Sequence, residues 1–437
     1  MKWILNFLYV LLLTLLSPVI LWRNLRHGRY RQGWKEKLLG RLPTFSSDSE
    51  VIWFHAVSVG EVLQLQHVVE HFRNATSDDV QILITTSTDT GFSLATERFA
   101  GCTVSWFPLD FSWAVSTALQ RVKPDLVVLV ELELWPNFLN TCASRGVRTA
   151  LINARLSDRS FSGYSRIQRI VRPLFQQFAI VAAQTTEYAD RLLTLGAQPT
   201  ATVVTGSIKF DGAESDRRNL NTQRLRALFN ITDSEVVFIA GSTQAPEEKL
   251  ALDVWQQLRA THPNLRLVLV PRHRERFDEV ADLVTAMNVS LLRRSQTEST
   301  STGGSDQVIL LDTIGELSAC WGLADIAFVG GSFGQRGGQN MLEPAAYGAA
   351  VCFGPNTWNF KDIVSRLLRA GGAKQLQSPD EFLPTVAELS NDAELRQQYG
   401  RAAQRFVAAQ PGAISRTVDL LSNSKKSKSS DPIRNAA

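Results

Sequence analysis

The sequence predicts an α/β protein built from two doubly wound parallel sheets joined by a polar linker. From residue 51 onward, apolar runs of strand length alternate with helical segments, which is typical of parallel sheets with helices on both faces. The same rhythm begins again at residue 236, after the polar stretch 211–230, which we expect to contain the linker. This pattern indicates two Rossmann-like domains that face each other across a cleft.

The expected strands are short apolar runs bounded by turn residues. In the first domain they cover residues 51–58, 81–86, 104–109, 125–130, 149–152, 179–183 and 201–204. In the second domain they cover residues 236–240, 266–270, 289–292, 308–311, 326–329 and 350–353. A chain of 437 residues is long enough for two such domains with further segments at its ends.

The composition describes a folded protein and argues against nucleic acid as a partner. Hydrophobic residues make up 44% of the chain and charged residues 20%. The formal net charge is only +4, and much of the positive excess lies at the two ends of the chain rather than across a domain face. The four cysteines are far apart, and no cysteine or histidine spacing suits a metal ion. We therefore expect reduced thiols, no disulfide framework and no metal site.

Residues 3–22 are almost all apolar and long enough for one membrane-spanning helix. A basic stretch follows at residues 23–41, which predicts that the rest of the chain stays on the cytoplasmic side, against anionic lipid headgroups. A cleavable signal peptide is the competing interpretation, but Pro18 and bulky residues stand where small residues should precede a cleavage site. A membrane-embedded hairpin and an interfacial helix are further alternatives, and both of them would also anchor the chain.

A glycine-rich loop follows the strand expected at residues 326–329. Five glycines within residues 330–338 allow a tight turn that presents backbone N–H groups, and Asn340 stands where the N-cap of a helix belongs. Such a helix start binds anions, and Glu343 in the first turn could accept hydrogen bonds from a ribose diol. The plain alternative is a connection whose glycines serve packing, but Arg336 in the loop favours a nucleotide site. The spacing fits neither the dinucleotide fingerprint nor a Walker A loop.

Polar side chains also follow the expected strands of the first domain, at the edge where parallel sheets bind ligands. Glu61 begins a helix directly after Ser58 and Gly60 and suits either a helix cap or a general base. Glu131 and Glu133 follow a very apolar strand and share one face of the chain. They are either catalytic acids or loop acids bound to nearby arginines.

Basic residues stand at further strand ends. Arg155 and Lys209 bring positive charge to the first domain. In the second domain Arg272 could bind a phosphate or carboxylate with both arms of its guanidinium group, whereas Arg276 is expected on the surface. Residues 312–316 form another polar set between a strand and a helix. The polar residues at three strand ends of the second domain thus suit the binding of a phosphorylated nucleoside. Those of the first domain suit the binding of an acceptor substrate.

The order of these motifs resembles the 3-deoxy-D-manno-octulosonic acid (Kdo) transferase family over nearly the whole chain. The matching motifs, in chain order, are H-A-V-S-V-G-E, E-L-E-L-W-P-N, L-I-N-A-R-L-S, G-S-I-K-F-D, P-R-H-x-E-R, D-T-I-G-E-L, F-V-G-G-S, G-G-Q-N-x-L-E-P and G-P-x-x-x-N-F. The resemblance implies the GT-B fold, with a single N-terminal anchor in the cell inner membrane and catalytic domains on its cytoplasmic side. It also implies transfer of Kdo from CMP-Kdo to the glucosamine disaccharide of a lipid A precursor, with inversion and without a cofactor.

The resemblance assigns roles to residues by matching motif. Glu61 is expected to be the general base, with Glu131 and Lys209 assisting the transition state. The CMP site is expected at Pro271, Arg272, Ile314, Gly315, Glu316, Asn340, Met341, Leu342 and Glu343. Further candidates are Ser58, Gly60, Arg155, Gly331, Ser332 and Arg336. Gln339 departs from the family, which commonly has histidine at this position.

We accordingly expect four segments along the chain. They are an N-terminal membrane anchor at 1–25, an acceptor domain at 26–211, a CMP-sugar donor domain at 212–421 and a disordered tail at 422–437. Because arginines and a lysine would neutralise the doubly anionic donor, no metal is required.

Two alternatives to this function remain open. One is a different nucleotide-sugar transferase that acts on a membrane lipid. The other is a non-enzymatic, membrane-anchored nucleotide-binding scaffold, which would not need Glu61, Glu131 and Lys209 at facing strand ends. The thermal response to CMP, compared with UDP and ADP, would separate them.

Overall fold

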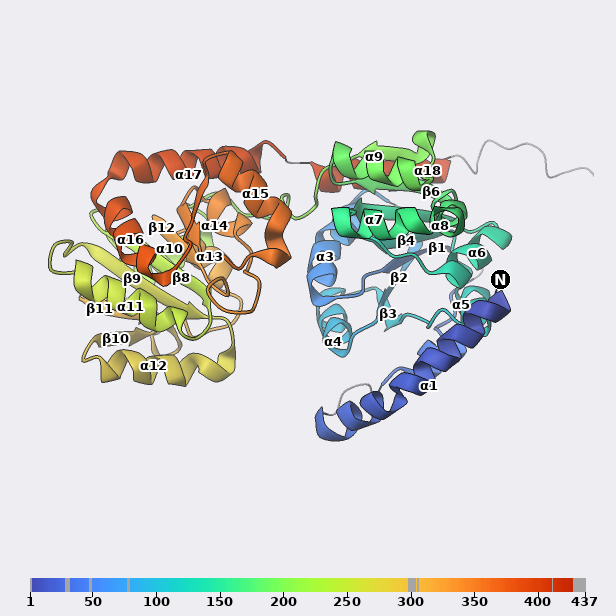
Figure 1. Ribbon diagram of the computed structural model, residues 1–437, viewed down its shortest axis with the longest axis horizontal. Helices are drawn as coiled ribbons and strands as arrows, with labels where there is room; N and C mark the ends of the chain where they lie inside the picture. Colours follow the sequence, from blue (N-terminus) through green and yellow to red (C-terminus); the bar gives the residue numbers. More distant parts are fainter. Residues whose placement is uncertain are drawn as a thin grey trace, which may run out of the picture. The chain divides into compact units, whose positions relative to one another are not determined.

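The computed structural model describes residues 2–27, 32–46, 49–76, 79–297, 304, 306–410 and 412–426. The chain forms two compact units, Met1–Gly212 together with Gly412–Ala437, and Ala213–Pro411. Within the described residues each unit holds one seven-stranded sheet, and the paired strands run parallel (Figure 1). Two parallel α/β sheets confirm the fold class that the alternation of strands and helices predicted.

The first sheet has the strand order β3-β2-β1-β4-β5-β6-β7. Its strands are β1 Glu50–His55, β2 Val80–Thr86, β3 Thr103–Trp106, β4 Leu126–Val130, β5 Arg148–Ala154, β6 Phe178–Ala183 and β7 Thr202–Val204. Each lies at an expected position. β1 ends earlier than expected because Ser58 is already the N-cap of the next helix.

Helices cover both faces of the first sheet. One face packs against α3 Val59–Asn74, α4 Asp89–Arg98 and α18 Ala413–Lys426, and the other against α5 Ser112–Val122, α6 Pro136–Ser144, α8 Gln168–Phe175 and α9 Thr186–Leu195. The unit also contains α1 Lys2–His27, α2 Trp34–Leu39, α7 Asp158–Arg166 and the 3-10 turn η1 Pro199–Ala201. Trp53 and Phe54 are both fully buried, one in the core of each face, as alternation along a strand requires.

The second sheet has the strand order β10-β11-β9-β8-β12-β13-β14. Its strands are β8 Val236–Thr243, β9 Leu265–Pro271, β10 Ser290–Arg293, β11 Gln307–Leu310, β12 Ile326–Val329, β13 Ala350–Phe353 and β14 Ala373–Gln375. The sequence did not predict β14. This strand has three residues, and its Lys374 and Gln375 leave no apolar run to detect.

The helical segments of the second unit are α10 Leu220–Leu228, α11 Glu247–Leu258, η2 Arg274–Arg276, α12 Phe277–Ala286, η3 Arg294–Gln296, α13 Leu317–Trp321, α14 Leu342–Ala346, η4 Trp358–Phe360, α15 Lys361–Arg369, η5 Pro379–Glu381, α16 Phe382–Asn391 and α17 Ala393–Ala408. Helix α10 lies inside the stretch where we expected the linker. Asn219 caps it, and Leu225 and Leu228 are buried, so most of that stretch belongs to the second unit.

Helix α18 lies in the first unit (Figure 1), although the sequence placed its residues in the donor domain and in the tail. Ile414, Val418 and Leu421 are buried in the core that α3 also forms. Asp211 accepts hydrogen bonds from two backbone N–H groups at the start of this helix. Since Asp211 lies at the end of the first segment of this unit, next to Gly212, the chain leaves and re-enters the first unit at one place. The rest of the expected tail, residues 427–437, lies outside the described residues.

Helix α1 occupies the place of the expected membrane anchor, and its first turns are bonded to the first unit (Figure 1). The buried Asn6 side chain donates to Ser112 Oγ at 2.7 Å and accepts from the Ser112 N–H at 3.0 Å. Tyr9 donates to a carboxylate oxygen of Asp110 at 3.0 Å. Other large apolar side chains of the helix are exposed: Trp3, Ile4, Phe7, Leu8, Val10, Leu11, Leu12, Leu15, Leu16 and Trp22.

A membrane-spanning anchor is not confirmed. In the parts of the chain that the structure describes, no helix combines the length and the apolar character needed to cross a membrane. Residues 28–31 of the expected basic stretch lie outside these parts.

Candidate active site

In each sheet the strand order reverses between two neighbouring strands, and open parallel sheets bind ligands beyond the carboxyl ends of such strands. These strands are β1 and β4 in the first unit, and β8 and β12 in the second. Glu61 follows β1 and Glu131 follows β4. The topology therefore brings these two carboxylates, which are far apart in the sequence, to the same point of the first sheet.

Glu61 lies in the first turn of α3 and caps it together with Ser58. Ser58 Oγ accepts from the Glu61 N–H at 3.4 Å, and the Glu61 carboxylate accepts from Ser58 Oγ at 2.7 Å and from the Val57 N–H at 2.8 Å. This is a reciprocal cap of the kind that the sequence S-V-G-E favours. Burial raises the pKa of Glu61, against the lowering effect of the two hydrogen bonds, and the nearby Glu131 raises it further. A carboxylate with a raised pKa suits proton transfer near neutral pH.

Gly60, directly before Glu61, leaves open space beside the cap. A Cβ atom at this position would meet only Ser58 Oγ, at 3.9 Å. Packing therefore does not require glycine here, and there is room for another molecule to approach Glu61.

Glu131 is the centre of a charged group. Its Oε2 lies 3.1 Å from Arg155 Nε, and its Oε1 lies 3.7 Å from Lys209 Nζ. The φ angle of Glu131 is +61°, a left-handed conformation that residues other than glycine adopt rarely and that is enriched at functional sites. Burial lowers the pKa of Lys209, while Glu131 opposes that shift. The loops after β4, β5 and β7 thus converge on one carboxylate.

Glu133 lies close enough to share the electrostatics of this group. Burial is the main cause that raises the pKa of Glu133 to about 7, and the charges of Glu61 and Glu131 raise it further. The nearby Trp135 side chain acts in the opposite direction. Near neutral pH the site therefore contains a carboxyl group that is only partly ionised.

Asn153 is a structural member of the site that the sequence placed at a strand end, in the motif L-I-N-A-R-L-S, without a role of its own. It is fully buried, with a φ angle of +51°. Its side chain accepts from the Ile208 N–H at 3.3 Å and donates to Gln64 Oε1 at 2.9 Å. Asn153 thus joins the end of β5 to α3 and to the loop that carries Lys209.

The glycine-rich loop of the second unit differs from our expectation. The carboxylate of Glu247 accepts hydrogen bonds from the N–H groups of Gly331 at 2.7 Å, Ser332 at 2.8 Å and Phe333 at 2.9 Å. The backbone donors that we assigned to a ligand anion are therefore bound to a side chain of the protein. A phosphate at these N–H groups would have to displace a buried carboxylate.

Asn340 caps the start of α14 with its side chain, but the N-cap residue that we expected at Asn340 lies one residue later. Met341 is the N-cap of α14, and Asn340 Oδ1 accepts from the Leu342 N–H at 3.1 Å. Asn340 Nδ2 also donates to Glu343 Oε1 at 2.9 Å. Burial raises the pKa of Glu343, whereas Asn340 and Arg272 lower it. Helix α14 has only five residues, so its dipole adds little, and the side chains of Met341 and Leu342 are buried.

The remaining donor candidates stand at loop positions of the second unit. Ile314 is 76% exposed, and Gly315 after it has a φ angle of +90°. Glu316 is the N-cap of α13 and binds Arg294 at 2.9 Å. Pro271 is the last residue of β9, and the exposed Arg272 follows it.

Two arginines of the second unit differ in their surroundings. Arg336 in the glycine-rich loop is exposed. Arg276, which we expected on the surface, is only partly exposed and pairs with Glu248 and Glu279.

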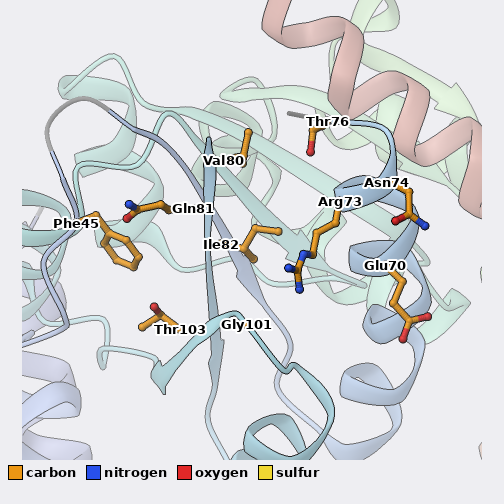
Figure 2. A pocket seen from close by; sticks show the side chains of 10 residues that line it. All are labelled: Phe45, Glu70, Arg73, Asn74, Thr76, Val80, Gln81, Ile82, Gly101 and Thr103. Carbon is orange, nitrogen blue, oxygen red and sulfur yellow. The ribbon is translucent and has the colours of Figure 1, made fainter. Parts of the chain in front are cut away.

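A pocket of about 740 Å³ lies at the opposite end of the first sheet (Figure 2). It is lined by the end of α3 and the first residues of β2 and β3: Phe45, Glu70, Arg73, Asn74, Thr76, Val80, Gln81, Ile82, Gly101 and Thr103. None of these residues is a candidate site residue, since the candidates follow the strands. Among the described residues, no group of three or more His, Cys, Asp or Glu side chains is placed to hold a metal ion.

Comparison with known proteins agrees with the resemblance. The model of the family described as 3-deoxy-D-manno-octulosonic-acid transferase (kdotransferase) matches residues 32–212. The chain is 34% identical over 426 residues to 3-deoxy-D-manno-octulosonic acid transferase of Haemophilus influenzae, covering 95% of this chain and 98% of that one. It is 34% identical over 432 residues to the protein of the same name from Bordetella pertussis, covering 94% of this chain and 98% of that one.

A solved structure with the same fold is MurG from Acinetobacter baumannii. Its TM-score is 0.54 at 13% identity, over 86% of this chain and 99% of that one, which is a likeness of fold alone. Two parallel α/β units of this kind make the fold GT-B-like, and the sequence relatives make the chain a glycosyltransferase. The chain belongs to the 3-deoxy-D-manno-octulosonic acid transferase family.

Proposed function

We propose that this enzyme transfers Kdo from CMP-Kdo to the glucosamine disaccharide of a lipid A precursor, with inversion at the anomeric carbon. The observation that carries the proposal is the placement of Glu61 beside the group of Glu131, Arg155 and Lys209, at the strand reversal of the first sheet. A base next to fixed positive charge suits the transfer of an anionic sugar to a hydroxyl group.

In the proposed reaction the acceptor hydroxyl oxygen forms the new bond to the anomeric carbon of Kdo. The bond from that carbon to the phosphate oxygen breaks, and its electron pair leaves with CMP. Glu61 takes the proton of the attacking hydroxyl group. Lys209 and Arg155 stabilise negative charge on the Kdo carboxylate or on the leaving group, and Glu131 orients both of them.

The second unit is proposed to bind the donor nucleotide. Glu343, oriented by Asn340, would accept hydrogen bonds from the ribose hydroxyls. Arg272 would bind the phosphate with its exposed guanidinium group. The exposed Ile314 at a loop tip would give the cytosine ring an apolar surface.

Mass analysis of the lipid tests the reaction directly. The protein is incubated with CMP-Kdo and a lipid A precursor, and the lipid should gain the mass of one or more Kdo residues. A thermal shift with CMP that exceeds those with UDP and ADP would support the donor assignment. A mass gain with a different nucleotide sugar alone would favour the alternative lipid glycosyltransferase. Nucleotide binding without any transfer would favour the non-enzymatic scaffold.

We further propose that α1 attaches the enzyme to the cytoplasmic face of the inner membrane. The exposed apolar side chains along α1 support this, and so does an acceptor that resides in a membrane. Phe7 and Leu15 are each 68% exposed, so a Phe7→Ser and Leu15→Ser double variant should leave the fold intact. Wild-type protein should float with anionic phospholipid vesicles, and the double variant should float much less. Equal flotation of both proteins would place the membrane contact elsewhere.

A further inference from the structure

Glu247 is a buried carboxylate that no step of the proposed reaction uses. It is the first residue of α11, directly after β8, and is 1% exposed. Oε1 accepts from the N–H groups of Ser332 and Phe333, and Oε2 accepts from those of Gly331 and Gln244. Two charge-assisted hydrogen bonds to each oxygen satisfy the carboxylate almost completely.

The glycine-rich loop is shaped around this carboxylate. A Cβ atom at Gly330 would lie 2.7 Å from Glu247 Oε2 and 2.6 Å from Thr243 Cα, so only glycine fits there. Burial raises the pKa of Glu247, and the four backbone donors lower it. The negative charge of Glu247 is therefore held by the surrounding backbone inside the protein, at the strand reversal of the second sheet.

Hydrogen bonds within the glycine-rich loop connect the backbone held by Glu247 to the proposed nucleotide site. The Gly338 N–H donates to the Gly331 carbonyl at 2.8 Å, which ties the two ends of the loop together. Asn340 follows two residues later and orients Glu343 through a hydrogen bond of 2.9 Å. A shift at Gly331 would therefore move the residues proposed to hold the ribose.

A second segment braces the middle of the same loop. Asn356 Nδ2 donates to the Gly334 carbonyl at 2.9 Å, and Asn359 Nδ2 donates to the Arg336 carbonyl at 2.7 Å. These bonds fix carbonyl groups, whereas Glu247 fixes N–H groups. The loop is therefore held from two sides, and Glu247 supplies the only charge among these braces.

The neighbouring Glu248, also in the first turn of α11, binds the segment after β9 in a similar way. It is 1% exposed and pairs with Arg276, four residues after Arg272. The first turn of α11 thus contacts two of the three loops that carry proposed donor residues, those after β9 and β12.

We propose that Glu247 is a positioning residue for the donor site. Its carboxylate occupies the anion position of the glycine-rich loop and holds residues 330–338 in the conformation that sets Asn340 and Glu343 for the nucleotide. The donor phosphate is then bound outside this ring of N–H groups. The inference rests on the proposed function, because it takes Asn340 and Glu343 as nucleotide contacts.

The test compares Glu247→Gln with a matched control in the same unit. Glu235→Gln also removes a buried charge, since Glu235 pairs with Arg266 at 3.2 Å at the other end of β8. Two quantities are measured: amide hydrogen exchange in the peptide that spans 326–341, and the Kd of CMP. Glu247→Gln should speed exchange at 331–333 and weaken CMP binding by about 10- to 100-fold. Glu235→Gln should lower the Tm and leave both quantities at the wild-type level.

Chemical rescue separates positioning from a general loss of stability. Glu247→Ala leaves a cavity beside the free N–H groups, which formate can enter. Millimolar formate should slow exchange at 331–333 in this variant and recover part of the CMP affinity, with no effect on wild-type protein or on Glu235→Gln. If Glu247→Ala does not fold, Glu247→Gln still decides the matter through exchange and the Kd of CMP.

The possible failures are distinguishable. Wild-type affinity and wild-type exchange in Glu247→Gln would overturn the role of Glu247. Absence of CMP binding by wild-type protein would overturn the donor assignment, and with it the positioning of a donor site by Glu247.

Discussion

At the scale of single residues, the Glu61 carboxylate is both a helix cap and the proposed base. Glu61→Gln keeps the shape of the side chain and one acceptor oxygen but removes the proton acceptor. Turnover should fall by about 10²- to 10⁴-fold, the usual contribution of a positioned base. The thermal shift with CMP should hardly change, because the nucleotide is proposed to bind the second unit. Steady-state rates and CMP titrations of the same preparation check both statements.

Ser58→Ala is the control for the capping role of Glu61. It removes the hydroxyl that accepts from the Glu61 N–H and donates to its carboxylate, at a cost of about 1 kcal/mol in stability. If Glu61→Gln and Ser58→Ala lose the same stability and Glu61→Gln keeps near-normal turnover, Glu61 is a cap only. The base would then have to be sought at Glu131 or Glu133.

Glu133 should make the stability of the protein depend on pH. The pKa of Glu133 is raised from 4.5 to about 7 in the folded protein, mainly by burial, so the folded state binds the proton more tightly than the unfolded chain does. This contribution is fully present below the unfolded pKa and is lost as the pH rises through the folded pKa. Glu133→Gln cannot titrate, so its urea midpoint should fall less between pH 5 and pH 7.5 than that of wild-type protein. If the urea midpoint falls equally in both proteins over this pH range, the raised pKa of Glu133 is contradicted.

Residues of the candidate site were predictable where a local sequence pattern indicated them. Glu131 stands directly after an apolar strand and Glu61 at the start of the helix that follows another, and parallel sheets collect such residues at one edge. Glu247 was not predictable in this way, because its partners in the glycine-rich loop lie 84 to 86 residues further along the chain. A glycine-rich loop in a sequence also does not reveal whether a ligand or a side chain fills it.

At the scale of secondary-structure elements, α1 is bonded to the first unit by a buried polar group. Asn6 and Tyr9 reach Ser112 and Asp110, and Asp110 also accepts from the N–H groups at the start of α6. Burial raises the pKa of Asp110 to about 6, against the effect of these hydrogen bonds. An Asn6→Ala and Tyr9→Phe double variant should therefore lose about 1–3 kcal/mol of stability, because it leaves buried groups without partners.

The contribution of α1 to stability can also be measured by thermal unfolding of the full chain and of a chain that lacks residues 2–22. The truncated protein should fold and bind CMP, since β1 begins only at Glu50, but its Tm should be lower. A Tm equal to that of the full chain would mean that the bonds of Asn6 and Tyr9 contribute nothing.

The strands were largely predictable from sequence, and the exceptions have physical reasons. Apolar runs flanked by turns mark buried parallel strands, and so each expected strand was found. β14 escaped detection because three residues with two polar side chains carry no such signal. Helix α18 was misplaced because a helical pattern does not say which sheet its apolar face will cover.

At the scale of the whole molecule, the proposed reaction depends on fixed positive charge. Arg155, Lys209 and Arg272 would neutralise the anionic donor. Turnover should therefore survive an excess of EDTA, measured with CMP-Kdo and a lipid acceptor. Loss of turnover that Mg²⁺ restores would show that these side chains are not sufficient.

The return of α18 to the first unit makes the second unit an insertion within the first. The core of the first unit needs Ile414, Val418 and Leu421, which the ribosome adds only after the whole second unit. Chains generally begin to fold from the N-terminus during synthesis, at about 5–20 residues per second. The part of the sheet face that α18 covers is therefore expected to stay exposed for roughly tens of seconds, whereas α1, the proposed membrane contact, is made at the start. The first unit, whose synthesis begins first, is thus completed last, after the inserted second unit has had time to fold.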